Sequence, residues 1–376
     1  MRRLKIRTVS ATFRFARPAT TSRGTLLEKR VPYIFLSEEG DPQVFGVGEC
    51  SLFPGLSADD RPGFDRRLAD LQRSIGKGAD PRHEDLSDWP SIAFGWETAL
   101  ADLEGGGRRL LFPSAFTEGR AAVPINGLVW MGSKEDMLAQ VKRKLDDGFR
   151  CLKLKIGALG GPSGEPAGEP GLGFDEEFSI LSGLRREFGE DELELRVDAN
   201  GAFSPEEAPG VLDRLASLRI HSIEQPIRAG QREAMARLCA TTPLPIALDE
   251  ELIGVASTAE RKALLDEIRP HFLIVKPGLL GGLCSCDEWI GLAAERGIGY
   301  WVTSALETAV GLNAIAQWAY TKGNPLRQGL STGKIFDTSI PSPLSLRGEE
   351  LWHLPEADWN LRAIENGGDV VGLGRD

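Results

Sequence analysis

Apolar and polar positions along the chain follow one rhythm up to about residue 115 and another after it. In the first part, runs with the two-residue period of a half-buried strand come before two stretches with the period of a helix. The expected strands cover residues 4–15, 31–40 and 43–50, and the expected helices cover residues 58–76 and 91–106. This order predicts an α+β capping domain in residues 1–115.

Beyond residue 123, short apolar runs alternate with amphipathic stretches. The expected strands cover residues 124–131, 151–156, 193–199, 221–227, 245–251, 271–277 and 299–305, with a short eighth run at 327–330. The helices expected between them cover residues 134–148, 175–189, 205–218, 231–240, 258–268, 286–297 and 311–322. Such alternation predicts an α/β fold, a TIM-like (β/α) barrel in modified form. We assign the barrel to residues 116–340 and expect residues 341–376 to pack back on the capping domain.

Three connections depart from this rhythm. Residues 157–174 are rich in Gly and Pro and too polar for a core, which predicts a surface insertion after the second barrel strand. In the capping domain, residues 18–26 and 51–57 are polar and contain glycine. Each is long enough to cover a neighbouring site, so both are candidate lids.

The composition narrows the class of protein. A chain of 376 residues with 41% hydrophobic content is long enough for a barrel and a second domain. A net charge of -11 and a pI near 5.1 argue against nucleic-acid and anionic-membrane partners, which need clustered Lys and Arg. No apolar stretch is long enough to span a bilayer, so we expect a cytoplasmic enzyme that acts on a small molecule. The 5 cysteines are scattered and do not suggest a disulfide framework.

Three acidic residues, Asp198, Glu224 and Asp249, follow apolar runs at nearly even intervals. They are about 25 residues apart, the length of one strand–helix repeat, so a barrel would bring all three to its carboxyl-terminal rim. Their hard oxygen atoms suit Mg²⁺, with Mn²⁺ as a substitute. One such residue alone would more often cap the next helix, but the repetition favours a metal site. Asn200 and Glu250 stand beside the expected ligands and could orient them.

Lysines lie on both sides of the acidic set. Lys153 and Lys155 share one face of their strand because side chains alternate along a strand, and Lys276 ends a strand across the barrel. Burial and mutual repulsion are expected to lower the pKa of the first two, which would make an amine a usable base. This arrangement suits a carboxylate substrate with a proton on its α-carbon, because a metal ion on the carboxylate stabilises the enediolate.

These residues resemble the active-site pattern of the enolase superfamily, in its muconate-lactonizing subgroup. The strings GECSLFPGLSADDRP, GFRCLKLKIGA, ELRVDANGAF, HSIEQPI, IALDEELIG and KPGLLGGL are further similar to the o-succinylbenzoate synthase family of the menaquinone pathway. The resemblance covers nearly the whole chain. It implies a lyase that dehydrates 2-succinyl-6-hydroxy-2,4-cyclohexadiene-1-carboxylate to 2-succinylbenzoate.

The resemblance also implies roles for single residues. Lys155 would remove the α-proton and then protonate the leaving hydroxyl group, while Lys153 would support the substrate carboxylate. Lys276 would place its cation over the ring and stabilise the enediolate. The three carboxylates would bind Mg²⁺, and Ser304 and Glu307 would contact the substrate, although Glu307 could equally cap the following helix. The string STGKIFDTSI, after the expected eighth strand, departs from the family pattern.

Three other functions stay open. Two opposed lysines could also racemise N-acylamino acids or epimerise dipeptides, with one base on each face. A sugar-acid dehydratase would need a histidine base late in the barrel, whereas His221 and His271 begin strands at the opposite rim, and the other histidines are His83 and His353. A non-catalytic barrel that serves as a binding protein would tolerate neutral residues at the charged positions, and this chain has charged residues at each of them. No oligomeric state is predicted.

Overall fold

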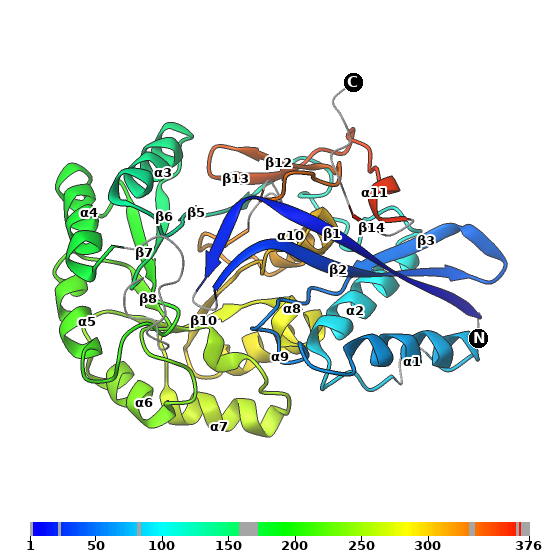
Figure 1. Cartoon of the computed structure of the whole chain (residues 1–376), viewed down its shortest axis with the longest axis horizontal. Coiled ribbons are helices and arrows are strands. Elements are labelled where there is room, and N and C mark those ends of the chain that lie inside the picture. Colours follow the sequence, from blue (N-terminus) through cyan, green and yellow to red (C-terminus); the bar gives the residue numbers. More distant parts are fainter. Residues whose placement is uncertain are drawn as a thin grey trace.

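The computed structural model describes residues 3–21, 24–80, 84–157, 172–330, 335–365 and 368–369 (Figure 1). Several parts of the chain named above lie outside these ranges, among them His83, residues 158–171 of the expected insertion, residues 22–23 of one candidate lid, residues 331–334 of the string STGKIFDTSI, and residues 366–367 and 370–376 of the C-terminal segment. Every helix in the described ranges is too short or too polar to cross a membrane.

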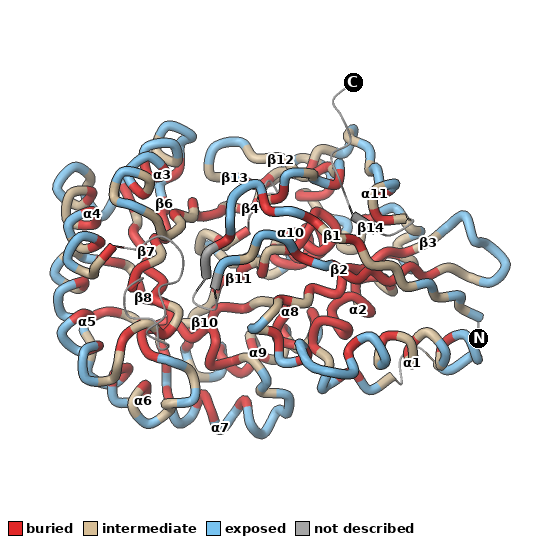
Figure 2. Tube along the Cα trace, viewed as in Figure 1, coloured by how far each residue is buried: buried red, intermediate tan, exposed pale blue. Residues whose placement is uncertain are grey.

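The capping domain is a mainly antiparallel sheet with helices packed on it. Its strand order is β14-β1-β2-β3, with β1 at Leu4–Thr21, β2 at Gly24–Glu38, β3 at Asp41–Glu49 and β14 at Gly368–Asp369. Helix α2 (Pro90–Glu104) approaches β3 closely because β3 carries glycine there: a Cβ at Gly48 would lie 1.9 Å from the carbonyl oxygen of Gly95. Figure 2 shows α2 buried along most of its length.

Two boundaries in this domain differ from the prediction. Helix α1 covers only Phe64–Gly76, because Gly63 before it has a φ of 100°, outside the helical region, and the residues preceding it form turns. Strand β1 ends at Thr21 and strand β2 begins at Gly24. The described part of the candidate lid at 18–26 is therefore the end of a β-hairpin. Polar residues can continue a strand because backbone hydrogen bonds, and not apolar side chains, form the ladder.

The barrel sheet has the strand order β11-β10-β9-β8-β7-β6-β5, and all of its pairs are parallel. The strands are β5 (Gly127–Val129), β6 (Cys151–Lys155), β7 (Glu194–Asp198), β8 (Ser222–Glu224), β9 (Ile246–Leu248), β10 (Phe272–Val275) and β11 (Gly299–Val302). At the eighth position, Gln328 bridges to Ile125 and Gly329 bridges to Thr303, so that the two edges of the sheet are joined. The predicted barrel fold is confirmed.

Helices cover the outside of this sheet (Figure 1). They are α3 (Lys134–Asp146), α4 (Phe174–Glu187), α5 (Ala208–Ala216), α6 (Arg232–Thr241), α7 (Thr258–Ile268), α9 (Gly282–Ala294) and α10 (Ala309–Thr321), with the short helices η2 (Glu250–Leu252) and α8 (Pro277–Leu280) after β9 and β10. Leu152, Leu154 and Val197 belong to the main hydrophobic core. Because side chains alternate along a strand, their neighbours Lys153 and Arg196 face the barrel interior.

The last part of the chain contacts both units. Strands β12 (Leu344–Arg347) and β13 (Glu350–His353) form a hairpin that pairs with β4 (Val123–Pro124), just before the barrel begins. Helix α11 (Arg362–Glu365) and β14 then lie beside β1 of the capping domain. The domain boundaries themselves stay a prediction.

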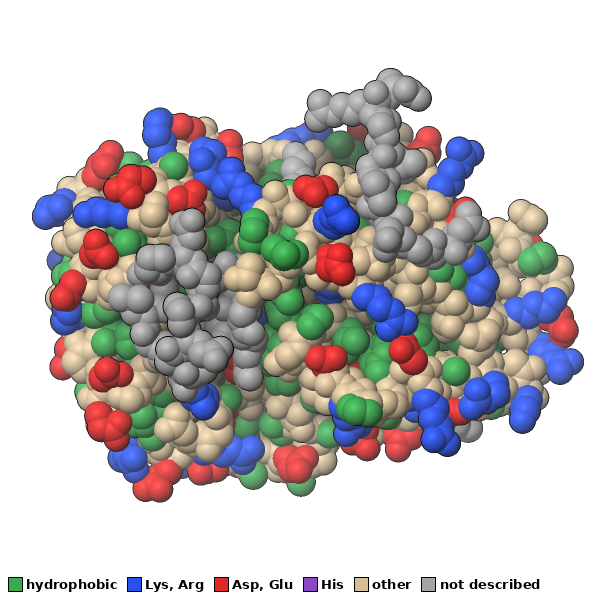
Figure 3. All heavy atoms as spheres, in the orientation of Figure 1, with side chains coloured by type: hydrophobic (Ala, Val, Ile, Leu, Met, Phe, Trp, Pro, Cys, Tyr) green, Lys and Arg blue, Asp and Glu red, His purple; other side chains and the backbone are tan. Residues whose placement is uncertain are grey.

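The face of the molecule seen in Figure 3 carries acidic and basic side chains in close mixture. Apart from the atoms drawn in grey, this face has no broad patch of Lys and Arg. A mixed surface of this kind does not attract a polyanion over a wide area. The exclusion of a nucleic-acid partner and the cytoplasmic location both stay predictions from the sequence.

A buried polar network joins the capping domain to the loop between β11 and α10. Glu49, the last residue of β3, is fully buried and accepts hydrogen bonds from the amides of Thr308 and Gly311, each at 3.0 Å. Thr308 Oγ1 donates to the same carboxylate at 2.6 Å. Lys29 of β2, also buried, donates to the carbonyl oxygen of Leu306 at 2.8 Å. Glu49 of the capping domain thus accepts hydrogen bonds from backbone amides at the N-terminus of a barrel helix, which have no partner within the helix itself.

Glu49→Ala should strongly destabilise the protein. The change leaves the amides of Thr308 and Gly311 without their acceptor and removes a negative charge from the surroundings of Lys29. We expect the free energy of unfolding, measured by urea denaturation, to fall by about 3–5 kcal/mol. The exposed Glu104 of α2 offers a control, since Glu104→Ala should cost less than about 0.5 kcal/mol. Similar losses in the two variants would show that the network does not hold the domains together.

Candidate active site

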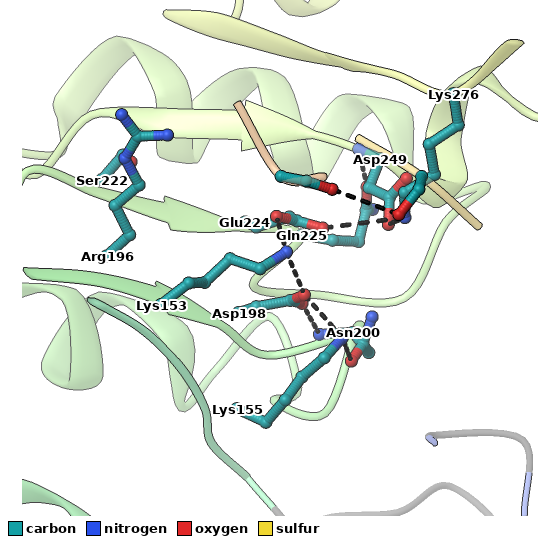
Figure 4. Close-up of polar contacts among 12 residues, drawn as sticks. Lys153, Lys155, Arg196, Asp198, Asn200, Ser222, Glu224, Gln225, Asp249 and Lys276 are labelled. Carbon is teal, nitrogen blue, oxygen red and sulfur yellow. Dashed lines mark hydrogen bonds and ion pairs between the residues drawn. The ribbon is translucent and has the colours of Figure 1, made fainter. Parts of the chain in front are cut away.

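Five charged side chains project from neighbouring strand ends into one end of the barrel (Figure 4). Lys155, Asp198 and Glu224 are the last residues of β6, β7 and β8, while Asp249 and Lys276 directly follow β9 and β10. The strand register pairs Lys155 with Asp198 and Asp198 with Glu224. Neighbouring strands lie about 4.8 Å apart, so this register places the side chains within reach of one another.

Two lysines of β6 contact the carboxylates from one side. Lys153 Nζ lies 3.1 Å from Asp198 Oδ2 and 2.8 Å from Glu224 Oε2. Lys155 Nζ lies 2.6 Å from Asp198 Oδ2. Asp198 therefore pairs with both ammonium groups. Lys153 and Lys155 lie on the same face of β6, as the sequence predicts.

The third lysine approaches from the opposite side (Figure 4). Lys276 Nζ forms an ion pair with Asp249 Oδ2 and lies 3.9 Å from Glu224 Oε1. We call the following six side chains the lysine–carboxylate cluster: Lys153, Lys155, Lys276, Asp198, Glu224 and Asp249. None of them is more than 13% exposed. Shielding from water strengthens the effect of each charge on its neighbours.

The three carboxylates of the cluster differ in pKa. Burial acts to raise the pKa of Asp198, but the charges of Lys155 and Lys153 outweigh it and hold this pKa well below its usual range. Burial, reinforced by the charge of Asp198, raises the pKa of Glu224 to about 8. Burial also raises the pKa of Asp249. Asp198 is thus the only one of the three whose pKa is lowered.

The lysine pKa values correct the prediction made from the sequence. Burial acts to lower the pKa of Lys153, but Glu224 and Asp198 outweigh it and leave this pKa raised. The pKa of Lys276 is raised in the same way, with Asp249 as the largest opposing charge. The expected lowering is wrong for Lys153, because two carboxylates contact its ammonium group and their effect exceeds that of burial and the charge of Lys276 together.

Of the two residues that the sequence places beside the expected ligands, Asn200 contacts the cluster and Glu250 contacts Asn200. Asn200 Oδ1 accepts a hydrogen bond from Lys155 Nζ at 2.6 Å, and its Nδ2 donates to Glu250 Oε1 at 2.9 Å. Its backbone amide donates to Asp198 Oδ1 at 3.1 Å. Asn200 has a φ of 45°, a left-handed conformation that asparagine adopts more readily than most residues. It thereby links the ends of β6, β7 and β9.

The chemistry of the cluster suits a hard divalent cation. All candidate donor atoms are carboxylate oxygens, and Glu224 Oε1 and Glu250 Oε2 are buried without a hydrogen-bond partner among the described residues. In the described part of the chain, however, no group of three or more His, Cys, Asp or Glu side chains is arranged so that it could hold a metal ion. The carboxylates point at the lysines instead. A cation fits the donor set, and its binding would require these side chains to turn.

The two predicted substrate contacts lie in different surroundings. Ser304 follows β11 at the same end of the barrel as the cluster and donates to the carbonyl oxygen of Gly329 at 3.3 Å. Glu307 is 2% exposed and accepts hydrogen bonds from Ser51 Oγ at 2.7 Å and from the amide of Ala305 at 2.6 Å. Both oxygens of Glu307 are thus engaged at the interface with the capping domain. Contact of either residue with a substrate stays a prediction.

Two buried residues of the barrel escaped the sequence analysis. Arg196 is fully buried, stacks on the ring of Trp301 at 4.4 Å and donates to Glu194 Oε1 at 2.6 Å. The alternation of β7 that turns Asp198 inward also turns Arg196 inward, so the sequence did contain a signal for it. Gln225, which directly follows β8, is fully buried as well.

His221 and His271 lie at the amino-terminal ends of β8 and β10, away from the cluster, as the sequence predicts. His221 Nδ1 lies 2.9 Å from Ser222 Oγ, and His271 Nδ1 accepts a hydrogen bond from the amide of Ile246 at 3.1 Å. Burial lowers the pKa of both histidines from the ordinary value of 6.5. The unfolded chain therefore takes up more protons below this pH, and the free energy of unfolding contributed by each histidine is lost as the pH falls.

His271→Asn should weaken this pH dependence. Asparagine can still accept the hydrogen bond from Ile246, but it does not titrate. The urea midpoint of the wild-type protein should therefore fall more than that of the variant between about pH 7.5 and pH 5.5, on either side of the ordinary histidine pKa. Equal changes in the two proteins would show that His271 contributes nothing to the acid sensitivity.

Comparison with known proteins agrees with this geometry. Residues 136–352 match the model of a family described as enolase C-terminal domain-like. The chain is 44% identical over 365 residues to an o-succinylbenzoate synthase of Desulfotalea psychrophila. This match covers 89% of this chain and 95% of the relative. The chain is also 29% identical over 261 residues to an N-succinylamino acid racemase of an Amycolatopsis species. That match covers 69% of this chain and 64% of the relative.

Solved structures of related enzymes also match this chain. The crystal structure of MenC from Desulfotalea psychrophila matches with a TM-score of 0.79 and 39% identity, over 93% of this chain and 99% of that one. The L-Ala-D/L-Glu epimerase of Bacillus subtilis matches with a TM-score of 0.77 at 20% identity, over 97% and 99% of the two chains, which supports the fold alone. The chain therefore belongs to the enolase superfamily and, within it, to the o-succinylbenzoate synthase family.

Proposed function

We propose that the chain dehydrates 2-succinyl-6-hydroxy-2,4-cyclohexadiene-1-carboxylate to 2-succinylbenzoate, a step of menaquinone biosynthesis. The observation that carries the proposal is that Lys153 and Lys155 meet the buried carboxylates from one side and Lys276 meets them from the other (Figure 4). The 44% identity to a relative named o-succinylbenzoate synthase, over 95% of its length, supports the choice of reaction. A flat substrate between these lysines has an ammonium group near each face.

In the proposed mechanism, Lys155 moves the proton. It takes the proton from the carbon that bears the substrate carboxylate, and the electron pair left behind forms an enediolate. The bond from the ring to the hydroxyl group then breaks, and Lys155 returns the proton to the leaving oxygen. The products are an aromatic ring and one water molecule. A single amine can serve as base and then as acid because both transfers occur on one face.

Lys153 and Lys276 act through their charges. Lys153 is 5% exposed and sits between Asp198 and Glu224, where its ammonium group supports the substrate carboxylate. Lys276 lies across the cluster, so its cation over the opposite face of the ring stabilises the enediolate. Neither lysine needs to exchange a proton with the substrate in this reaction.

For the cofactor we propose Mg²⁺, with Mn²⁺ as a substitute, held by the carboxylates of the cluster: Asp198, Glu224 and Asp249. When bound, the cation would polarise the substrate carboxylate and offset the negative charge that raises the pKa of Lys153 and Lys276. Asn200 and Glu250 would keep the carboxylates oriented through their mutual hydrogen bond. Support comes from the oxygen-only donor set and from the superfamily, whose enzymes generally use a divalent metal.

Racemisation of N-succinylamino acids is a second candidate. It is favoured by the same opposed placement of Lys155 and Lys276, since racemisation needs one base on each face of the α-carbon. A relative at 29% identity carries the name N-succinylamino acid racemase. We prefer dehydration as the function because the relative at 44% identity, which matches over nearly its whole length, is named o-succinylbenzoate synthase.

Turnover of both substrate classes tests the proposal. Purified protein with Mg²⁺ should convert the cyclohexadiene substrate, and the absorbance of the aromatic product should rise. N-succinylamino acids in deuterated water should be assayed in parallel by the loss of the α-proton signal and by optical rotation. If only N-succinylamino acids react, the racemase is the correct function. If neither substrate reacts while Mg²⁺ still binds, both candidates are wrong.

A further inference from the structure

Gln225 has an unusual backbone conformation at the end of β8. It follows Glu224 directly, is fully buried and has a φ of 42°. A non-glycine residue rarely adopts this left-handed conformation, which costs conformational energy unless other contacts repay it. The side chain consequently leaves the in-and-out alternation of the strand and contacts the residues after β9. Figure 4 shows Gln225 beside Glu224 and Asp249.

Every hydrogen-bonding group of the Gln225 side chain is used. Oε1 accepts from the backbone amides of Asp249 at 3.1 Å and Glu251 at 3.3 Å. Nε2 donates to the carbonyl oxygen of Ile227 at 3.0 Å and to Glu251 Oε2 at 3.4 Å. The side chain therefore ties the end of β8 to the backbone of Asp249, a carboxylate of the cluster.

The backbone of Gln225 adds ties to two further strand ends. Its amide donates to the carbonyl oxygen of Ala247 in β9 at 2.9 Å. Its carbonyl oxygen accepts from the amide of Gly201, in the loop after β7, at 2.7 Å. Gly201 has a φ of 76°, and a Cβ there would lie 2.8 Å from the Cα of Arg228, so the approach of this loop depends on glycine. One residue thus connects the ends of β7, β8 and β9, each of which carries one carboxylate of the cluster.

We propose that Gln225 is a positioning residue that fixes the separation of Glu224 and Asp249 for a divalent cation. The inference rests on the proposed function, because it assumes that a cation binds these carboxylates. Only an amide satisfies the site, since it must accept twice and donate twice. A glutamate would turn an oxygen toward the carbonyl of Ile227 and the carboxylate of Glu251, and an apolar side chain would leave two buried amides without an acceptor.

The chain offers a closely matched control in Gln317 of α10. This glutamine is also fully buried, and its Oε1 accepts from two backbone amides, those of Leu111 at 2.9 Å and Phe112 at 3.1 Å. Its Nε2 donates to one carbonyl oxygen, that of Arg109 at 2.8 Å, and to one side-chain oxygen, Asn313 Oδ1 at 2.9 Å. Gln317→Leu removes the same number and kind of hydrogen bonds as Gln225→Leu, away from the cluster.

The experiment is a calorimetric titration of Mg²⁺ into the wild-type protein and the variants Gln225→Leu, Gln225→Met and Gln317→Leu. We expect both Gln225 variants to bind Mg²⁺ roughly 10- to 100-fold more weakly, the range found when a residue that supports metal ligands is lost. Gln317→Leu should bind like the wild type, although its melting temperature falls to a similar degree. In assays, the Mg²⁺ concentration for half-maximal rate should rise by the same factor in the Gln225 variants, while kcat at saturating Mg²⁺ changes far less.

Wild-type affinity for Mg²⁺ in a folded Gln225 variant would overturn the inference, as would equal weakening in Gln317→Leu. Gln225→Met keeps the length of the side chain and is measured if Gln225→Leu does not fold. If neither Gln225 variant folds while Gln317→Leu does, Gln225 serves the fold and not the cation. If the wild-type protein binds no Mg²⁺, the proposed cofactor is wrong, an outcome distinct from a failure of the Gln225 variants alone.

Discussion

Lys155→Ala should abolish dehydration. We expect kcat to fall by roughly 10⁴-fold, the upper end of what a general acid or base contributes, because one amine performs both proton transfers in the proposed mechanism. The variant keeps all three carboxylates proposed to hold Mg²⁺, so the ion should still bind. The rate is measured from product absorbance at saturating Mg²⁺, and the binding of Mg²⁺ is measured by calorimetry.

Lys142 provides the control for this change. It lies on α3, its side chain is 76% exposed, and it pairs with Asp146 at 2.8 Å. Lys142→Ala should leave kcat within about twofold of the wild type, because surface substitutions of this kind have small effects. Activity of Lys155→Ala above about one hundredth of the wild type, the least that a general base usually contributes, would mean that another group takes the proton.

Glu224→Gln should remove the binding of Mg²⁺ and, with it, turnover. Glu224 occupies the middle of the cluster, with Lys153 at Oε2 and Lys276 near Oε1. A neutral amide at this place removes a charged ligand, so the loss of affinity should exceed the roughly 10- to 100-fold typical of residues that only support ligands. Glutamine keeps the size of the side chain and an oxygen that can accept from Lys153, which also retains Asp198 as a partner, so the protein should still fold without added Mg²⁺.

Asp102→Asn tests whether loss of any buried carboxylate has this effect. Asp102 of α2 is fully buried and accepts hydrogen bonds from the amides of Val47 at 2.9 Å and Arg109 at 2.6 Å, within the capping domain. The variant should lose stability and retain the wild-type affinity for Mg²⁺. Calorimetry on both variants makes the comparison. An affinity of Glu224→Gln equal to that of the wild type would exclude Glu224 from the metal site.

The sequence sufficed to locate most of the cluster. Parallel strands of one barrel run in the same direction, so charged residues at the ends of successive apolar runs must converge on one rim. Asp198, Glu224 and Lys155 end their strands, and the structure brings them into contact with their predicted neighbours. Alternation along β6 was enough to place Lys153 and Lys155 on one face.

Properties that depend on contacts between distant segments could not be predicted in this way. The pKa of Lys153 is raised because carboxylates of two other strands reach its ammonium group, and no spacing within β6 reveals that distance. Glu307 is held by Ser51, which lies 256 residues away in the chain. The contacts of Gln225 depend on a positive φ that turns its side chain out of the strand pattern. The periodicity of a sequence predicts its strands, but it does not predict the contacts between distant segments on which these three features depend.

A crystal structure with Mg²⁺ and 2-succinylbenzoate bound would test the central claim most directly. We expect one Mg²⁺ ion with oxygen atoms of Asp198, Glu224 and Asp249 at about 2.0–2.1 Å, the usual distance for this ion. The product carboxylate should contact the ion, with Lys155 and Lys276 on opposite faces of the aromatic ring. An ion bound by other residues, or a product with both lysines on the same face, would contradict the account.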